Sequence, residues 1–146
     1  MSFLSSLDIS GSALTAERYR ADIILQNIAN ADIPAAAGEE PYRRKQVVFQ
    51  ERPLTFGETL RGVQEANVKS GGVRITEIVE NDRDFRPVYD PTNPNADEDG
   101  YVYYPNVDTT EERIDLMAAV NAYTANLTAL SVVKAMTMQA LEIGRQ

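Results

Sequence analysis

The chain contains no cysteine and no histidine among its 146 residues. Without cysteine there is no disulfide framework, no thiol nucleophile and no thiolate metal site. Without histidine the chain lacks the commonest general base and the commonest metal ligand near neutral pH. The sequence also shows no glycine-rich phosphate loop, nucleophile elbow or paired-carboxylate motif. We therefore predict a protein that is not an enzyme, with no catalytic residues, no cofactor and no metal site.

Positive charge is scarce as well. The chain has 14 Lys+Arg against 22 Asp+Glu, a formal net charge of −8. Sequence-independent binding of DNA or RNA needs clustered positive charge, so nucleic acid is not an expected partner. Residues 1–13 lack the basic and apolar regions of a cleavable signal peptide. No apolar run is expected to reach the length that spans a bilayer, so direct membrane insertion is not predicted. These features suit a cytosolic protein, or one exported without a cleaved signal.

The C-terminal stretch, residues 109–146, is the most regular part of the chain. Thr109 and Glu112 have the spacing of a capping box. No proline follows, so one helix is predicted from about Thr110 to about Ile143, roughly 50 Å long at 1.5 Å per residue. Large apolar residues recur there in three- and four-residue steps and share one helix face. They are Leu116, Val120, Tyr123, Leu127, Leu130, Met138 and Leu141.

Very little of this predicted helix is charged. Between Asp115 and Glu142 the only charged residue is Lys134. A surface helix of a monomer has one apolar stripe and one charged face. We therefore expect this helix to be surrounded by the other end of the chain, by neighbouring subunits, or by both. The alternative is the central helix of an ordinary small bundle.

A second helical pattern runs from about Phe3 to Ala31 and stops before Pro34, because the residue preceding a proline is disfavoured in a helix. Its apolar residues follow the spacing of a coiled-coil seam. They are Leu7, Leu14, Ala21, Ile24, Ile28 and Ala31. Since both chain ends are helical and apolar on one face, the economical arrangement pairs them. The two helices are expected to form either an antiparallel hairpin or a coiled coil whose helices are connected by the long middle segment of the chain.

The middle of the chain carries strand and turn signals. Residues 32–41 are a linker, and residues 51–72 are predicted as a loop with one short helical turn. Strands are predicted over Tyr42–Gln50, Val73–Glu80, Phe85–Tyr89 and Gly100–Tyr104. The predicted fold class is α+β, with long N- and C-terminal helices paired as a coiled coil and a small mainly β module inserted between them. The three predicted parts are residues 1–31, 32–108 and 109–146.

An acidic loop over residues 95–106 is the one candidate for a metal. Asn95, Asp97 and Asp99 supply oxygen ligands at positions one, three and five of a calcium loop, and Gly100 occupies position six. The match fails at position twelve, because Asn106 cannot supply a bidentate carboxylate. A solvated acidic turn is the favoured interpretation. A soluble calcium-dependent binding module is the alternative function.

Two further motifs each allow two interpretations. The basic run Arg-Arg-Lys at residues 43–45 suits a phosphate or lipid headgroup, but a polar strand edge facing solvent or an acidic neighbour is favoured. Tyr101, Tyr103 and Tyr104 suit a sugar- or base-stacking platform. The net acidity and the surrounding turns favour core or interface packing instead.

Several motifs taken together resemble the flagellar axial proteins of the rod and hook, and the proximal-rod branch of that family in particular. The resemblance extends over nearly the whole chain, and the order and spacing of the motifs make it specific. The motifs lie at residues 13–18 (Ala-Leu-Thr-Ala-Glu-Arg), 27–31 (Asn-Ile-Ala-Asn-Ala), 41–50, 71–73, 88–94, 100–108, 122–126 and 141–144.

The resemblance implies a structural subunit of the bacterial flagellar basal-body rod. Such a subunit polymerises through its terminal helices into a tubular axial structure that transmits torque and surrounds the export channel. The implied partners are copies of itself, other flagellar rod subunits, the rod-to-membrane-ring adaptor, ring proteins around the rod and the flagellar export apparatus. The implied location is the basal-body rod crossing the periplasm, reached without a cleaved signal peptide.

The same resemblance implies which residues pack between subunits. Helices that lack cover in the monomer are expected to fold on assembly. Three asparagines, Asn27, Asn30 and Asn126, are expected to set the register between helices, as buried asparagine does in coiled coils. The expected apolar packing residues are Leu7, Leu14, Ala21, Ile24, Ile28, Leu116, Val120, Tyr123, Leu127, Leu130, Met138 and Leu141.

Overall fold

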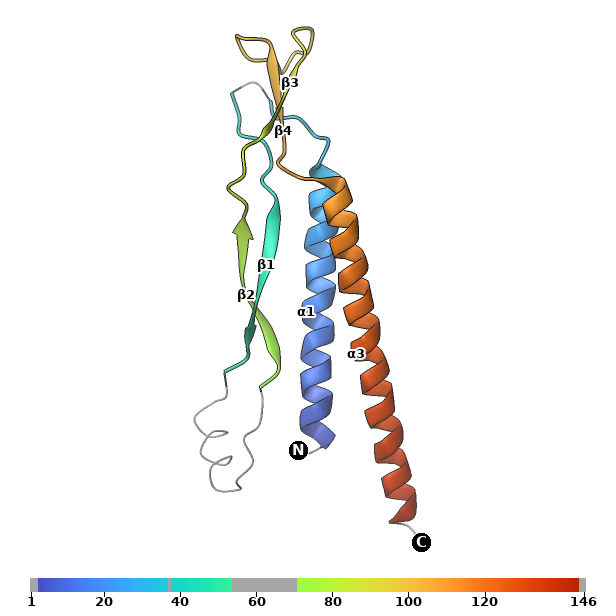
Figure 1. Ribbon diagram of the computed structural model, residues 1–146. Coiled ribbons are helices and arrows are strands. Elements are labelled where there is room, and N and C mark those ends of the chain that lie inside the picture. The colour runs from blue at the N-terminus through green and yellow to red at the C-terminus, as the bar shows by residue number, and fades with distance from the viewer. Residues whose placement is uncertain (1–2, 37, 54–70, 145–146) are drawn as a thin grey trace. The chain divides into compact units, whose positions relative to one another are not determined.

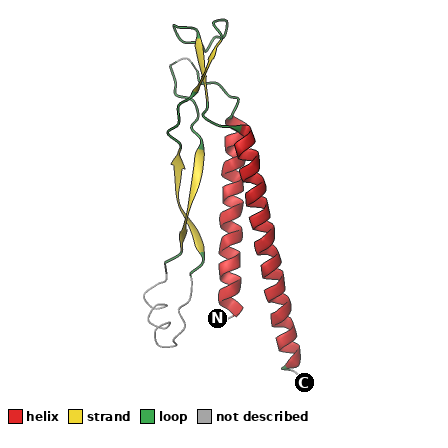
Figure 2. Cartoon of the chain, viewed as in Figure 1, coloured by secondary structure: helices red, strands yellow, loops and turns green. Residues whose placement is uncertain are grey.

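A computed structural model describes residues 3–36, 38–53 and 71–144 (Figure 1 and Figure 2). Its elements in chain order are α1 (Phe3–Asn30), β1 (Lys45–Glu51), β2 (Val73–Glu80), β3 (Arg86–Tyr89), β4 (Tyr101–Tyr104) and α3 (Thr109–Ile143). The strands form two two-stranded sheets, β1 with β2 and β3 with β4. The predicted α+β class is confirmed, whereas pairing of the helices as a coiled coil stays a prediction. The helical turn predicted within residues 51–72 falls mostly outside the described residues.

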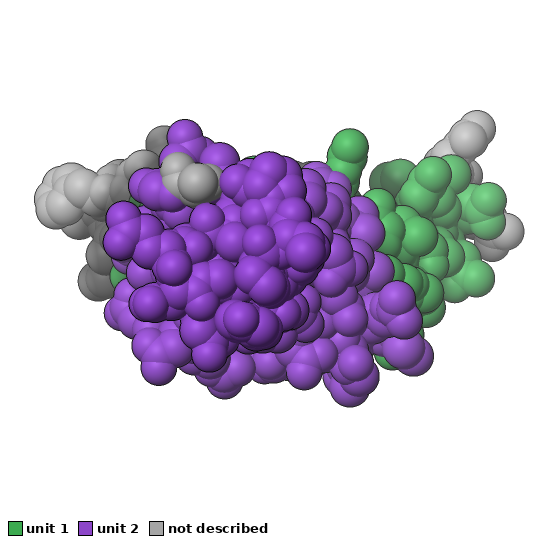
Figure 3. Space-filling model, turned by 90° about the horizontal axis from the view of Figure 1, so that it is seen from above, with its two compact units in different colours: residues 1–19, 49–76, 119–146 green, residues 20–48, 77–118 purple. Residues whose placement is uncertain are grey.

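The chain divides into two compact units, which Figure 3 shows in separate colours. Unit 1 comprises residues 1–19, 49–76 and 119–146, and unit 2 comprises residues 20–48 and 77–118. Both terminal helices and the β1–β2 sheet contribute sections to each unit. The division therefore runs across these elements rather than between them.

Helix α3 begins with a cap provided by Asp108. The Oδ1 atom of Asp108 accepts from the backbone N–H of Thr110 at 2.8 Å and of Glu111 at 3.4 Å. These backbone N–H groups hold the pKa of the Asp108 carboxyl below its usual value. The predicted capping box of Thr109 and Glu112 was wrong. The Glu112 side chain turns instead into the interior of unit 2 and leaves the cap to Asp108.

Helix α3 is the one described helix that is long and apolar enough, by length and composition, to cross a membrane. Its most apolar window has a mean hydropathy of 1.4, and 6% of that window is buried. The expectation that no apolar run approaches this length was wrong by this measure. Helices that pack against other protein meet the same criteria, so the property alone assigns no membrane role.

In unit 1, a pair of glycines lets the start of β2 approach α1. The Oγ of Ser12 donates to the carbonyl of Ile9 at 2.8 Å and accepts from the backbone N–H of Val73 at 3.0 Å. Gly72 has a φ of +82°, and a Cβ at this position would collide with the Ser12 hydroxyl. A Cβ on Gly71 would collide with the backbone carbonyl of Arg52. The Gly-Gly-Val motif is therefore a close-approach site.

In unit 2, β3 and β4 form an antiparallel ribbon. The opposed residues are Arg86 and Tyr104, Pro87 and Tyr103, Val88 and Val102, and Tyr89 and Tyr101. One step beyond the ribbon, the N–H of Asp90 donates to the carbonyl of Gly100 at 3.0 Å. Hydrogen-bonded and non-hydrogen-bonded pairs alternate in such a ladder, so Pro87 occupies a non-hydrogen-bonded position. Its missing N–H costs the ribbon no bond.

Candidate functional site

A cluster of charged and amide side chains is buried in unit 2. The exposed fractions are 0% for Glu112, 1% for Asn27 and 3% for Arg44. The Oε1 of Glu112 accepts from the Arg44 Nε, and its Oε2 accepts from the Asn27 Nδ2 at 2.9 Å. A carboxylate offers two acceptor oxygens, so Glu112 satisfies both donors at once.

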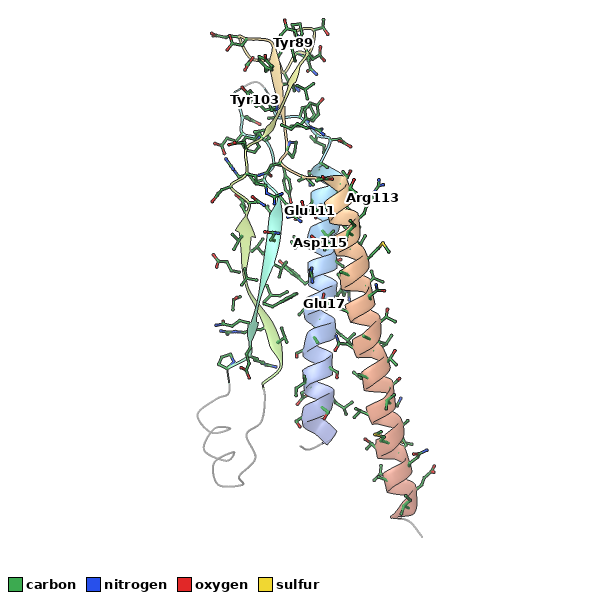
Figure 4. All side chains as sticks on the ribbon, in the orientation of Figure 1. Glu17, Tyr89, Tyr103, Glu111, Arg113 and Asp115 are labelled. Atoms are coloured by element: carbon green, nitrogen blue, oxygen red, sulfur yellow. The ribbon has the colours of Figure 1, made fainter. Side chains whose placement is uncertain are left out.

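Arg44 is surrounded by three carboxylates of the first turns of α3. Besides Glu112, its guanidinium lies 2.9 Å from Asp115 and 3.3 Å from Glu111. Figure 4 shows Glu111 and Asp115 on this part of α3, with Arg113 pointing away from them. Burial alone would lower the pKa of Arg44, but the hydrogen bond and charge of Glu112, with the two other carboxylates, raise it. The prediction of a basic run facing solvent or a neighbour was wrong for Arg44, which is an internal ion-pair partner.

Asn27 joins three elements through one amide group. Its Oδ1 accepts from the backbone N–H of Lys45 at 3.0 Å and from the Tyr42 hydroxyl at 2.8 Å. Its Nδ2 donates to the carbonyl of Lys45 at 2.8 Å as well as to Glu112. Burial, followed by the negative charges of Glu112 and Glu80, raises the pKa of Tyr42. Within the chain Asn27 thus sets the position of α1 against β1 and α3, and any role between subunits stays a prediction.

Asn106 is a second connecting amide, and sequence reasoning missed it. Its Oδ1 accepts from the backbone N–H of Arg44 at 2.8 Å. Its Nδ2 donates to the carbonyls of Asn81 and Arg83, each at 2.8 Å. In the sequence Asn106 is the failing twelfth position of a calcium loop and part of the motif at residues 100–108, and neither feature predicts this connecting role. The signal in the sequence was a single amide side chain between two apolar residues, Pro105 and Val107, both of which the structure buries.

The acidic loop uses its side chains to form its own turn. The Asp97 Oδ1 accepts from the backbone N–H of Asp99 at 3.0 Å and of Tyr101 at 2.8 Å. Gly100 follows with a φ of +83°, the left-handed conformation that suits glycine. No group of three or more Asp, Glu, His or Cys among the described residues is arranged to hold a metal ion. Nothing in this loop supports the calcium alternative.

The large apolar side chains of α3 beyond residue 119 are mostly exposed. Among the predicted packing residues, Val120, Leu127 and Leu141 are exposed by 51%, 48% and 61%. Met138 and Tyr123 are exposed as well. The less exposed side of this section carries mostly smaller or polar residues, namely Ala119, Ala122, Asn126, Leu130, Val133 and Thr137. Most of the larger apolar side chains in this section of α3 are therefore exposed to water.

The remaining predicted packing residues are more covered. Ile24 is buried in unit 2. Asn30 and Asn126 donate to carbonyls of their own helices, those of Gln26 at 2.7 Å and Ala122 at 2.9 Å. The residues with intermediate exposure are Leu7, Leu14, Ala21, Ile28, Asn30, Leu116, Asn126 and Leu130.

Comparison with known proteins gives one consistent result. Residues 98–143 match the family described as "Flagellar basal body rod FlgEFG protein C-terminal". The chain is 44% identical to the flagellar basal-body rod protein FlgC of Bacillus subtilis, over 99% of this chain and 100% of that protein. It is 39% identical to FlgC of Escherichia coli O157:H7 over 99% of this chain and 100% of that protein. It is 34% identical to FlgC of Borreliella burgdorferi over 98% of each.

Proposed function

Because this chain belongs to the family of flagellar basal-body rod proteins named FlgC, we propose that it is a structural subunit of the bacterial flagellar basal-body rod. It polymerises through its terminal helices into a tubular axial structure that transmits torque and surrounds the export channel. Its location under this proposal is the basal-body rod, which crosses the periplasm. Its partners are copies of itself, other rod subunits, the rod-to-membrane-ring adaptor, the surrounding ring proteins and the export apparatus.

The observation that carries this proposal is the exposed apolar surface of α3. Fully burying one leucine or methionine side chain contributes about 1.5–3 kcal/mol, so covering several of them gives a strong drive to associate. Leu127, Met138 and Leu141 supply such side chains, and the single lysine of this section, Lys134, adds little repulsion. Contacts that repeat without closing on themselves build an open helical tube.

The buried polar cluster supports the same proposal from within the chain. Asn27, Arg44 and Glu112 satisfy one another, so they need no partner from a neighbouring subunit. Assembly then depends on the apolar helix faces. Asn30 and Asn126 set the register between helices of different subunits under this proposal.

A charge in the middle of the exposed face of α3 tests the proposal. Leu127→Asp is compared with Leu127→Met, which keeps an apolar side chain of similar size. Leu127 is half exposed, so Leu127→Met should unfold within about 0.5 kcal/mol of the parent chain and Leu127→Asp within about 1–2 kcal/mol, which leaves both variants folded. In cells carrying the variant as the only copy, Leu127→Asp should abolish rods in basal-body preparations, while Leu127→Met should form them.

Export is measured separately, by quantifying the chain outside the cytoplasm, so that a secretion defect is not mistaken for an assembly defect. Rods of normal number and length built from Leu127→Asp would show that this face of α3 is not buried in the assembly. The proposal would then be wrong about the terminal helix.

A further inference from the structure

One face of the β3–β4 ribbon is aromatic and exposed. Directly opposed residues of an antiparallel pair project to the same side, so Pro87, Tyr89, Tyr101 and Tyr103 share one face. We call these four residues the tyrosine face. The three tyrosines are exposed by 66%, 40% and 41%. On the opposite face Val102 is exposed by 1% and its partner Val88 by 38%. Three exposed tyrosines gathered on one face of a short ribbon form an aromatic patch, which suggests that the tyrosine face is a contact surface.

The tyrosine face is held in place before any partner arrives. The rings of Tyr89 and Tyr101 meet edge to face, with centroids 5.3 Å apart and an interplanar angle of 66°. They form a non-hydrogen-bonded pair, in which side chains approach most closely. Gly100, with a φ of +83°, lies under this pair, and a Cβ there would come within 3.0 Å of the Tyr89 ring. Figure 4 shows Tyr89 and Tyr103 on the same ribbon.

The ribbon offers side chains rather than a free strand edge on the β4 side. The carbonyl of Tyr101 accepts from the N–H of Asp97 at 2.9 Å, and that of Tyr103 accepts from the N–H of Ala35 at 3.2 Å. Both outward-pointing carbonyls of β4 are therefore occupied. Addition of a partner strand at this edge is disfavoured, so recognition has to use the rings themselves.

The charge around the tyrosine face is negative. Asp97, Glu98 and Asp99 follow one another in the loop that leads into β4. The charge of Asp97, with smaller contributions from burial and Asp99, raises the pKa of Tyr103. A groove of about 210 Å³ beside the face is lined by Glu39, Asp97, Tyr101 and Tyr103, with no lysine or arginine among its described lining residues.

Elsewhere in the chain, aromatic rings already have cations of their own. The Arg43 guanidinium lies 4.4 Å from the centre of the Phe85 ring, and Arg86 lies 5.2 Å from that of Tyr104. Lys45 lies 5.3 Å from the centre of the Tyr42 ring. Over the three rings of the tyrosine face, the described part of the chain places no such cation. Rings with negative faces and neighbouring carboxylates favour a cation from outside.

From these observations we infer that the tyrosine face binds an arginine- or lysine-bearing segment of a different protein. A second copy of this chain is a poor occupant of this face, because its Arg43, Arg44 and Arg86 already contact rings or carboxylates of their own chain. The surface lies on the β3–β4 ribbon, outside the terminal helices, so the inference goes beyond the proposed function. The binding energy comes from cation–π contact with the rings and from attraction by the acidic loop.

Site-specific photo-crosslinking in cells tests the inference. A benzophenone amino acid replaces Tyr101 in the full chain, and the crosslinked peptide is identified by mass spectrometry. We expect a peptide of a different protein with arginine or lysine beside the crosslinked residue. The variant Asp97→Asn/Asp99→Asn removes two charges, while asparagine retains the side-chain oxygen that closes the turn. This variant should reduce the crosslink about five- to tenfold.

Two control positions make the result specific. Tyr19, exposed by 41% and distant in sequence, is replaced in the same way, and its crosslinks should not change in the Asp97→Asn/Asp99→Asn variant. The benzophenone at Leu127 reports on rod packing separately. Once the basic residue of the partner is known, its replacement by aspartate should weaken the crosslink, and Asp99→Lys should restore it.

Several outcomes overturn the inference. The inference is refuted if position 101 crosslinks to another copy of this chain or to a peptide without basic residues. It is also refuted if the crosslink yield is unchanged in the Asp97→Asn/Asp99→Asn variant. A crosslink at position 127 without one at position 101 refutes it and leaves the proposed function standing. Absence of crosslinks at both positions contradicts the proposed function as well.

Discussion

Replacing Glu112 by glutamine keeps the size of a buried side chain but removes one of its two acceptors. In the parent chain Oε1 accepts from Arg44 and Oε2 accepts from Asn27. Whichever way the glutamine amide is oriented, its NH₂ group faces one of these two donors. The variant loses a charge-assisted hydrogen bond, worth about 1.5–3 kcal/mol, and leaves a buried donor unpaired at a cost of about 1–3 kcal/mol. Arg44 keeps Asp115 and Glu111 as partners, so we expect a net loss of about 3 kcal/mol.

This loss is measured by chemical denaturation followed by far-ultraviolet circular dichroism near neutral pH. The matched control is Glu111→Gln, on the same helical turn. The Glu111 side chain is 43% exposed, and its ion pairs with Arg44 and Arg83 are 3.3 and 3.4 Å long. A pair of this kind contributes about 0–1 kcal/mol. Equal losses for the two variants would refute the role assigned to the buried carboxylate.

A double-mutant cycle with Asn27→Ala isolates the proposed cause. Without the Asn27 amide, the glutamine at position 112 can turn its oxygen to Arg44 while its NH₂ group faces no donor. The loss of unfolding free energy caused by Glu112→Gln should then be about 1–3 kcal/mol smaller in the Asn27→Ala variant than in the parent chain. An equal loss in both would show that the missing charge, and not the unpaired donor between positions 27 and 112, destabilises the Glu112→Gln variant.

Three further predictions concern other parts of the chain. Gly72→Ala should lower the free energy of unfolding by about 1–3 kcal/mol, because it combines a positive φ with a collision at Ser12. The control is Gly11→Ala, which lies in a helix with nothing within 4 Å of the new Cβ and should raise the free energy of unfolding by about 0.5–1 kcal/mol. Thermal unfolding of the two variants measures both effects. A loss of stability in both variants would refute the assignment of Gly72 as a close-approach site. The lowered pKa of Asp108 contributes stability that is complete above its ordinary value of 3.8 and is lost as the pH falls through the lower folded value. Asp108→Asn should therefore reduce the loss of unfolding free energy at acidic pH, as measured by denaturation at a series of pH values. An unchanged pH dependence would show that other carboxylates cause the loss. Hydrogen exchange should show the amides of residues 119–143 gaining protection between the purified chain and isolated basal bodies, while residues 20–48 and 77–118 are protected in both. Equal protection of residues 119–143 in both states would contradict folding on assembly.

Local pattern predicted most of the secondary structure. Strand β2 has the predicted bounds, Val73–Glu80, and α3 ends at Ile143 as expected. These features depend on residue periodicity and on nearby proline, which act within a few residues. The errors were also local. Strand β1 begins at Lys45 rather than Tyr42, and the cap of α3 is one residue earlier than predicted, because aspartate and threonine are both good caps.

The polar cluster could not be predicted in the same way. Arg44 and Glu112 are 68 residues apart, and Asn27 and Glu112 are 85 apart. Nothing near Arg44 distinguishes it from its neighbour Arg43, whose guanidinium lies over the Phe85 ring and near Glu40. Glu112 could equally have completed a capping box. A charged residue can be buried only when folding supplies its partners, and those partners are distant in sequence.

The sequence by itself determined the two long helices, the short strands between them, the absence of cysteine and histidine chemistry, and the resemblance to flagellar axial proteins. Each of these follows from residue types and short spacings. The tertiary structure alone decided which arginine is buried, which residue caps α3, which side chains of α3 stay in water and which face of the β3–β4 ribbon presents its tyrosines. The physical reason is that burial and hydrogen bonding depend on contacts between distant segments, whereas periodicity determines only which residues share a face.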